Sequence, residues 1–558
     1  MSRLDMSYRG VWLVVRVIAD SYTLLRLATL YTFNHEARAA PRAEDTLNRR
    51  GERHVEEAEQ EVKKRELSMF REVYPIQEPY VYAAIVMDPE TQKVRYTVIE
   101  PTLLKEETSI LKEIKGILME EVDINLKEIG TREKAAEYLK KKIRETVRNH
   151  QLRIPEEAVD KLTYYVVRDF VYYGRIDPIM KDRMVEDISA DGVNIPVYVW
   201  HREYESLPTN VAFTDENELN SFIVRLAYLS GKNISIASPL LDSSLPDGSR
   251  VQLTYGNAIT RRGSTFTIRR FRTDPLTISD LIGSRTLSSE MAAYFWYAIE
   301  NRASVLVAGG VASGKTTMLN CLSMFIKPEL KIVSVEDTAE LNLPHENWIP
   351  SVVRTGFGND EKGPGAITLF DLLKAAVRQR PDFIIVGEVR GEEAYTLFQA
   401  MATGHLGMST IHAESVDSVI NRLESEPMNI PKPLLAMIDV VTIQARTEVD
   451  GKPTRRTMAV TEVESFHPKT KDLLTREVFS WNPKNDAYRF NGQSHLLEKH
   501  MEKMGLGEEE VRKELNRRKT VLEWMARRKI RKYTEVAGVI REYYTNPDRI
   551  HRKARMGG

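Results

Sequence analysis

Apolar and polar residues alternate or recur at helical spacing along most of the chain after its charged N-terminal part. Alternation at residues 81–86 and 94–99 predicts two paired strands. Apolar residues that recur every three or four positions predict amphipathic helices over 107–126 and 131–150. A further helical stretch, 157–173, begins a second folded unit.

This second unit mixes short strands with helices. Short apolar runs predict strands at 188–189 and 196–200, and a helix is expected over 216–230. A strand pair at 249–253 and 264–271 closes the unit. Such a mixed order is typical of an α+β domain.

From about residue 287 the pattern becomes strand, glycine-containing loop and helix, in repeated order. Repetition of this kind indicates an α/β fold with a doubly wound, mainly parallel sheet. The patterns together divide the chain into a poorly ordered leader and charged linker (1–68), a first N-terminal domain (69–154), a second, α+β, N-terminal domain (155–274), a hinge (275–286), the α/β domain (287–490) and a helical, basic C-terminal region (491–558).

The N-terminal segment contains a fairly apolar stretch, residues 11–31. Arg16, Asp20 and Arg26 interrupt it, so neither a membrane-spanning helix nor a cleavable signal peptide fits. We interpret it as an amphipathic helix or an unstructured leader, and we expect a cytoplasmic protein without a transmembrane segment.

Composition narrows the classes of function. Lys plus Arg and Asp plus Glu both number 80 in 558 residues, so no global basic charge indicates nucleic-acid binding. The single cysteine, Cys321, excludes an intrachain disulfide framework and a zinc site made of cysteines, and its apolar surroundings indicate a small buried side chain.

A complete GxxxxGK[ST] pattern lies between a predicted strand, 304–308, and a predicted helix, 317–325. In this context glycines let the backbone wrap around phosphate, and the helix N-terminus adds partial positive charge. Lys315 is expected to reach the β- and γ-phosphates of ATP, and Thr316 to bind Mg²⁺. Nucleotide contacts are therefore expected from Gly309, Gly310, Val311, Ala312, Ser313, Gly314, Lys315, Thr316 and Thr317.

Two carboxylates follow apolar strands of the same domain. Glu336 follows 331–335, and Glu388 follows 383–387. Because parallel strands end at one edge of a sheet, both carboxylates are expected near Mg²⁺ and the γ-phosphate. Arg390 is placed to pair with a carboxylate or to reach a phosphate.

Two histidines flank the next predicted strand, 408–411. His412 comes at its carboxyl end and is expected to sense phosphate, whereas His405 fits a structural role equally well. They are seven residues apart without an acidic partner pattern, which argues against zinc.

Four segments in order resemble the secretion-superfamily ATPases of type II secretion, type IV secretion and type IV pili. GGVASGKTT, VSVEDTAEL, IIVGEVRG and TGHLGMSTIHA are similar to that family's Walker A motif, Asp box, atypical Walker B motif and His box, respectively. Residues 174–178 and 186–189 resemble the start of the family's second N-terminal domain, and 191–209 looks closest to archaeal pilus and archaellum motors. The chain lacks the four-cysteine insertion of many bacterial type II motors and the AIRNLIRE-type motif of retraction motors.

The resemblance implies a homohexameric ring of RecA-like P-loop ATPase subunits, with smaller α+β domains preceding the ATPase domain. Glu336 would activate water, Glu388 would hold Mg²⁺ through water, and His412 would couple the γ-phosphate to conformational change. Candidate arginines that close over the phosphates are Arg250, Arg269 and Arg270. The implied partner is an integral membrane platform protein at the inner face of the cell membrane, and neither zinc nor nucleic acid is expected as a ligand.

Two other functions stay open at this point. A RecA-like nucleic-acid translocase would bind DNA in a salt-sensitive way, and a nucleotide-gated scaffold would bind ATP with little turnover. A small-molecule kinase would need an acceptor site that we do not find in the sequence. The basic residues around 517–532 face a membrane, a partner or only solvent.

Overall fold

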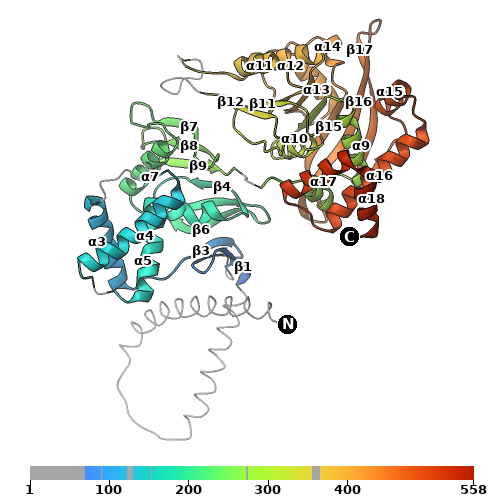
Figure 1. The fold of residues 1–558 in the computed structure, drawn as a ribbon. Coiled ribbons are helices and arrows are strands. Elements are labelled where there is room, and N and C mark those ends of the chain that lie inside the picture. The colour runs from blue at the N-terminus through green and yellow to red at the C-terminus, as the bar shows by residue number, and fades with distance from the viewer. Residues whose placement is uncertain are drawn as a thin grey trace. The chain divides into compact units, whose positions relative to one another are not determined.

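The computed structural model describes residues 69–88, 91–121, 130–152, 154–271, 274–354, 363 and 365–557 (Figure 1). The predicted leader and charged linker, residues 1–68, lie outside these described residues. The chain divides into two compact units, Met1–Arg270 and Phe271–Gly558. Each unit carries one large sheet with helices, so the predicted mixed α/β class is confirmed.

A nine-stranded sheet forms the centre of the first unit, in the order β1-β2-β3-β6-β5-β4-β9-β8-β7. The predicted strand pairs β2/β3 and β8/β9 are confirmed as antiparallel neighbours. The strands are β1 (Phe70–Gln77), β2 (Val81–Met87), β3 (Val94–Ile99), β4 (Val185–Ala190), β5 (Pro196–His201), β6 (Glu205–Ala212), β7 (Leu240–Ser244), β8 (Arg250–Thr254) and β9 (Thr265–Arg269).

The two predicted N-terminal domains share this sheet. Its junction is narrow, because β3 pairs with β6 through Tyr96 and Thr209 alone. Side chains reinforce the junction: the hydroxyl groups of Tyr74 and Tyr96 both donate to Oδ2 of Asp182, at 2.7 and 2.6 Å. Strands β1 and β3 are therefore attached by side-chain hydrogen bonds as well as by the sheet.

Helices of the first unit form two groups. The first group packs around its own apolar core, and the second covers the sheet. They are α3 (Lys105–Glu121), α4 (Arg132–Asn149) and α5 (Glu156–Phe170) in the first group, and the short η3 (Gly174–Ile176), α6 (Asp177–Lys181) and α7 (Glu216–Leu229) in the second. Thr131, the predicted first residue of its helix, caps α4 by accepting from the backbone N–H of Lys134.

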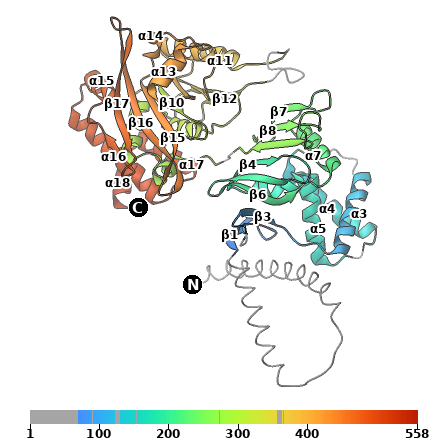
Figure 2. The same cartoon turned by 180° about the vertical axis from the view of Figure 1, so that it is seen from behind.

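The second unit has a sheet in the order β12-β11-β13-β14-β10-β15-β16-β17-β18 (Figure 2). Neighbours from β12 to β15 are parallel, and β16 to β18 continue as an antiparallel meander. The strands are β10 (Val305–Gly309), β11 (Ile332–Glu336), β12 (Trp348–Val352), β13 (Phe383–Val386), β14 (Leu406–Ile411), β15 (Val440–Val449), β16 (Lys452–His467), β17 (Asp472–Asn482) and β18 (Ala487–Phe490).

Helices cover both faces of this sheet. On β10, Val305 and Val307 belong to one core and Leu306 and Ala308 to the other, because successive side chains of a strand point to opposite faces. One face carries α8 (Ile278–Gly283), α9 (Ser289–Glu300), α10 (Lys315–Ser323), α16 (Glu508–Arg527), α17 (Tyr533–Thr545) and α18 (Pro547–Met556), with α15 (His495–Met504) packed at its border. The other carries α11 (Leu369–Arg378), α12 (Glu393–Ala402), α13 (Val416–Glu424) and α14 (Lys432–Leu435).

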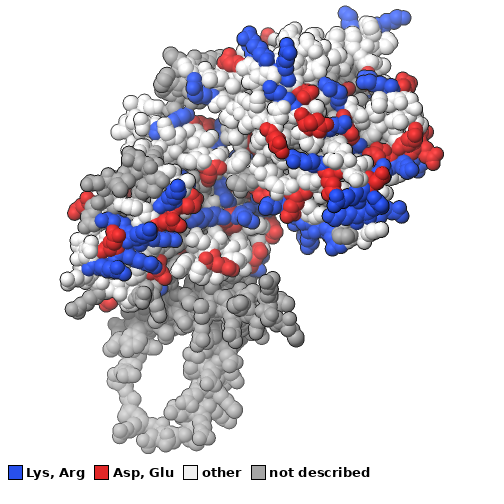
Figure 3. All heavy atoms as spheres, in the orientation of Figure 1, with Lys and Arg blue, Asp and Glu red and all other residues white. Residues whose placement is uncertain are grey.

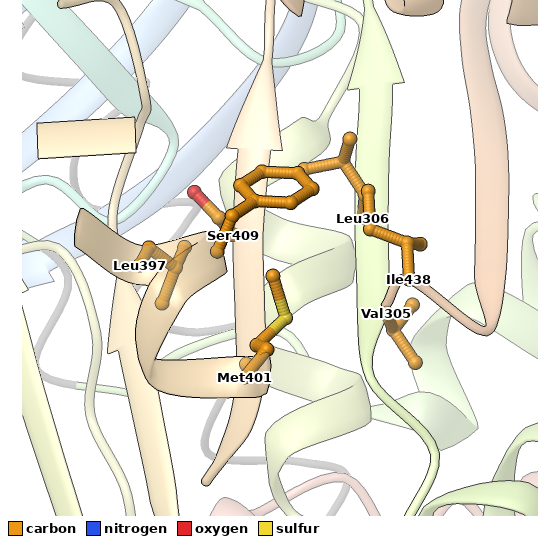
Figure 4. A pocket seen from close by; sticks show the side chains of 8 residues that line it. Val305, Leu306, Leu397, Met401, Ser409 and Ile438 are labelled. Carbon is orange, nitrogen blue, oxygen red and sulfur yellow. The ribbon is translucent and has the colours of Figure 1, made fainter. Parts of the chain in front are cut away.

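Packing between β10, β14 and α12 leaves a small apolar cavity of about 10 Å³ (Figure 4). That volume holds about one water molecule and excludes any larger ligand. At its border a Cβ added to Gly407 would lie 2.4 Å from Sδ of Met401. A side chain at this position would therefore require the Met401 side chain to move.

Candidate active site

Four parallel neighbours of the second unit end at one edge of the sheet. In space their order is β11, β13, β14 and β10, and their last residues are Glu336, Val386, Ile411 and Gly309. The glycine loop, Glu388 and His412 follow directly after these ends. The strand ends therefore bring the glycine loop, Glu336, Glu388 and His412, which the sequence analysis predicted as site residues, to one edge of the sheet.

The glycine loop is built from backbone positions that tolerate little change. A Cβ added to Gly309 would lie 2.4 Å from the carbonyl oxygen of Gln444 and 2.4 Å from Oγ of Ser313. Gly314 has φ 91° and is the N-cap of α10. Both glycines are needed for the chain to turn from β10 into the helix.

Hydrogen bonds inside the loop fix its shape. Oγ of Ser313 and Nζ of Lys315 both donate to the carbonyl oxygen of Gly310, each at 2.9 Å. Thr316 and Thr317 are half-buried in the first turn of α10, and the Val311 side chain is 81% exposed at the tip of the loop. The loop and the helix N-terminus together present backbone N–H groups suited to a phosphate chain.

Glu336 is a buried carboxylate with one unused oxygen. Its Oε1 accepts from the backbone N–H groups of Glu340 and Leu341, at 3.1 and 3.0 Å. Its Oε2 is buried without a hydrogen-bond partner among the described residues. Burial raises the pKa of Glu336 to about 7, which suits a group that takes a proton near neutral pH.

His412 connects the glycine loop to the end of β13. Its Nε2 lies 3.4 Å from Nζ of Lys315 and 3.6 Å from Oε1 of Glu388. Desolvation and the nearby Lys315 ammonium lower the pKa of His412. The imidazole is therefore mainly neutral at pH 7, and the tautomer with an unprotonated Nε2 can accept from Lys315.

Arg390 binds two carboxylates at the same edge. Its Nε lies 3.3 Å from Oε2 of Glu388, and its Nη2 pairs with Asp337. The other oxygen of Glu388, Oε1, is buried and has no hydrogen-bond partner in the described chain. Lys315, His412, Glu388 and Arg390 thus form one chain of polar contacts.

The donor atoms of the site fit Mg²⁺. Glu336 and Glu388 each have a buried oxygen without a hydrogen-bond partner, and Thr316 contributes a hydroxyl group in the first turn of α10. Mg²⁺ prefers oxygen ligands and usually keeps several waters, so two carboxylates and a hydroxyl group suffice. Within the described residues, no group of three or more His, Cys, Asp or Glu side chains is arranged to hold a metal by itself.

Arg455, on β16, is a site residue that the sequence analysis did not identify. Its Nε donates to the carbonyl oxygen of Ala312 at 3.0 Å, and its Cδ would lie 3.3 Å from a Cβ added to Gly314. Its exposed side chain forms no ion pair with a carboxylate of the described chain. An additional cation therefore lies against the glycine loop, 143 residues away in sequence.

The remaining predicted residues have contacts of their own within their units. Nδ1 of His405 lies 3.2 Å from the carbonyl oxygen of Ala400 at the end of α12. The three candidate arginines belong to the first unit: Arg250 and Arg269 are opposite each other on β8 and β9. Arg250 pairs with Asp242 at 2.6 Å, and Arg270 donates to backbone carbonyl oxygens, including that of Val185 at 2.9 Å.

Residues 174–525 match the family described as Type II/IV secretion system protein. This match covers more than half of the chain, and the chain therefore belongs to that family. It includes the strand ends, the glycine loop and the residues gathered there.

Two relatives in sequence agree with this assignment. An uncharacterized protein of Methanocaldococcus jannaschii is 36% identical over 498 residues, which cover 85% of this chain and 88% of the relative. The type IV secretion system protein PtlH of Bordetella pertussis is 31% identical over 288 residues, 47% of this chain and 83% of that protein. Among solved structures, the VirB11 ATPase from the Brucella suis type IV secretion system is 23% identical, with a TM-score of 0.26 over 51% of this chain and 94% of that chain. No helix among the described residues is both long and apolar enough to cross a membrane.

Proposed function

We propose that this protein is an ATP-hydrolysing motor with a RecA-like P-loop domain, and that it drives assembly of a type IV pilus, an archaellum or a related secretion system. The observation that carries the proposal is the meeting of the glycine loop with Glu336, Glu388 and His412 at one sheet edge. Membership of the secretion family supports the biological setting.

The glycine loop and Lys315 bind the phosphates of ATP, and Thr316 and Glu388 hold Mg²⁺, which neutralises phosphate charge when bound. Glu336 acts as the base. A water oxygen bonds to the γ-phosphorus, the bond from that phosphorus to the β–γ bridging oxygen breaks, and ADP leaves. The water proton passes to the Glu336 carboxylate, whose raised pKa favours its uptake.

His412 and Arg390 couple hydrolysis to motion. His412 lies within reach of both Lys315 and Glu388, so loss of the γ-phosphate changes the charge that its imidazole senses. Arg390 transmits the change to Asp337 through its ion pair. In the assembled motor, Arg250, Arg269 and Arg270 of the first unit are proposed to close over the phosphates, in the way that the family resemblance implies.

The motor is proposed to work as a homohexamer on the cytoplasmic face of a cell membrane, against an integral membrane platform protein. The four sequence blocks and the likeness of residues 191–209 to archaeal members support an archaeal assembly motor. The 36% identity to a Methanocaldococcus protein along most of both chains agrees with that branch.

The test measures ATP binding, ATP hydrolysis and particle mass of the full chain, with and without nucleotide. Wild type is expected to hydrolyse ATP and to form a hexamer, and Glu336→Gln is expected to bind ATP with at least a hundredfold loss of turnover. Glu346→Gln, which changes an 87% exposed carboxylate, is the matched control and should keep full activity.

Three outcomes would contradict the proposal. Equal turnover in wild type and Glu336→Gln removes the base from the mechanism. ATP binding without any turnover, in a protein that stays monomeric, favours a nucleotide-gated scaffold. Stimulation by DNA, with salt-sensitive DNA binding, favours a nucleic-acid translocase.

A further inference from the structure

The C-terminal helices carry a concentration of positive charge that the proposed site does not use. Between residues 511 and 558 the sequence has fifteen Lys and Arg residues against five Asp and Glu residues, in a chain whose net charge is zero. Figure 3 shows Lys and Arg side chains gathered on the surface of the last helices. The excess of positive charge is therefore confined to the C-terminal helices and requires an explanation in that part of the structure.

Several of these cations have structural partners inside the second unit. Arg518 is buried between Glu300 and Glu514, Arg517 pairs with Asp548, and Lys519 pairs with Glu290. Further pairs join Arg531 to Asp280, Arg541 to Glu346 and Arg549 to Glu542. These residues fix the helices to one another and to the rest of the unit.

The other nine cations are exposed and form no ion pair with a carboxylate of the described chain. Two of them, Arg512 and Lys513, lie in the first part of α16, and the remaining seven lie from the end of α16 onward. We call them the C-terminal basic surface: Arg527, Arg528, Lys529, Lys532, Arg552, Lys553 and Arg555. Leaving so many like charges together costs electrostatic free energy unless an anion is bound there.

The arrangement of α16 and α18 brings these residues together. Arg517 pairs with Asp548, and Nζ of Lys553 lies 5.5 Å from the ring centre of Trp524, so the two helices run side by side in the same direction. Their carboxyl ends consequently lie at the same level. Ile550 and Ala554 anchor α18 in the core, which leaves its charged side turned outward.

We propose that the C-terminal basic surface docks on the anionic headgroups of a lipid bilayer. This proposal rests on the proposed function, which sets the protein at a membrane. The surface itself lies on different elements from the proposed nucleotide site. Clusters of four to eight Lys and Arg residues on amphipathic helices attract anionic lipid phosphates by about 1 kcal/mol per residue.

Two features favour a bilayer over nucleic acid. Met556, at the tip of α18, is 83% exposed, so an apolar side chain stands among the cations where it can enter a lipid interface. Trp524 and Tyr543, aromatic residues of the helices behind the surface, are buried. They are unavailable for stacking on bases, which single-stranded nucleic acid requires.

The experiment compares binding of the full chain to vesicles of phosphatidylcholine alone and of phosphatidylcholine mixed with phosphatidylglycerol, by co-sedimentation. The test variant combines Arg528→Gln, Arg552→Gln and Arg555→Gln. The matched control removes three exposed lysines of α4 in the first unit, by Lys134→Gln, Lys140→Gln and Lys141→Gln. All three proteins are first compared by thermal unfolding, and exposed substitutions of this kind are expected to leave the midpoint unchanged.

Wild type and control are expected to bind only the anionic vesicles, and their affinity should fall as the salt concentration is raised. The test variant is expected to bind these vesicles roughly a hundredfold more weakly than wild type. Equal binding of the test variant and the control would overturn the proposal. Tighter binding of wild type to duplex DNA than to anionic vesicles at the same salt concentration would also overturn it. Vesicle binding is measured without nucleotide, so it can be interpreted even if the protein proves not to hydrolyse ATP. Conversely, if the basic surface does not bind lipid, the ATP turnover of wild type still tests the proposed function.

Discussion

At the scale of single residues, the buried carboxylate of Glu336 makes stability depend on pH. Its folded-state pKa, about 7, lies above the ordinary value of 4.5, so the folded state holds the proton more tightly than the unfolded state. The resulting stabilisation is complete below about pH 4.5 and is lost as the pH rises through 7.

We predict that Glu336→Gln, which cannot ionise, unfolds at higher denaturant concentration than wild type at pH 8. The gain is at most about 3 kcal/mol without nucleotide and should vanish near pH 4. Urea titrations at the two pH values measure it, with Glu346→Gln as the exposed control. A gain of the same size at both pH values would show that the charge is not the cause.

Arg455 is expected to affect nucleotide affinity, because it contacts the glycine loop and none of the residues proposed to act in hydrolysis. Removing its guanidinium frees the carbonyl of Ala312 and takes a cation away from the glycine loop, where the proposed function places the phosphates. We predict that Arg455→Ala raises KM for ATP about tenfold with little change in kcat, and that Arg455→Lys restores part of the loss. Lys452→Ala, three residues away on the same strand, should behave as wild type; a fall in kcat alone would contradict this role.

These two residues also show how far sequence can lead. Glu336 could be predicted because it stands at the end of an apolar strand, and strand ends of a parallel sheet converge. Arg455 could not, since only the register of β16 against β15 places it beside a loop 143 residues earlier. The orphaned oxygens of Glu336 and Glu388 likewise depend on packing that no local pattern encodes.

At the scale of elements, a buried carboxylate on β16 holds the start of α15. Oε2 of Glu462 accepts from the backbone N–H of His495 at 2.6 Å, and Oε1 accepts from Tyr294 at 2.6 Å and from Ser494. Because Glu462 is fully buried, its removal leaves these donors without acceptors.

We therefore predict that Glu462→Ala lowers the free energy of unfolding by on the order of 3 kcal/mol. The matched control is Glu464→Ala, two residues along the same strand, where the half-buried carboxylate pairs with Arg476 and the loss should stay below about 1 kcal/mol. Equal losses for the two variants, measured by urea unfolding, would refute the capping role.

Elements with strong periodicity or a clear cap could be predicted, and those set by tertiary contacts could not. Helix α4 begins after the predicted Thr131, whereas β6, ESLPTNVA, has proline and few buried positions and owes its strand form to β5. The predicted hinge contains α8, whose Ile278 and Leu281 enter the core of the second unit. The predicted helical tail likewise turns out to cover one face of the second sheet.

At the scale of the whole molecule, each compact unit has its own apolar core. Ile268 lies in a core of the first unit, and Ile550 in a core of the second; both are fully buried. We predict that calorimetry resolves separate transitions, and that Ile268→Ala and Ile550→Ala each lower a different one. Each loss should be about 2–4 kcal/mol. A common shift of both transitions by either variant would mean that the units unfold together.

The place of α18 in the core has a consequence for biosynthesis. Ile550 and Ala554 pack in the same cluster as Val305 and Val307 of β10, some 245 residues earlier in translation. While the ribosome is still making the last helices, the finished strands keep an uncovered apolar face that nascent-chain chaperones can recognise. The first unit can fold as it emerges, but the core of the second unit stays incomplete until α18 has been made. A ribosome that stalls before that point would release a chain prone to aggregate.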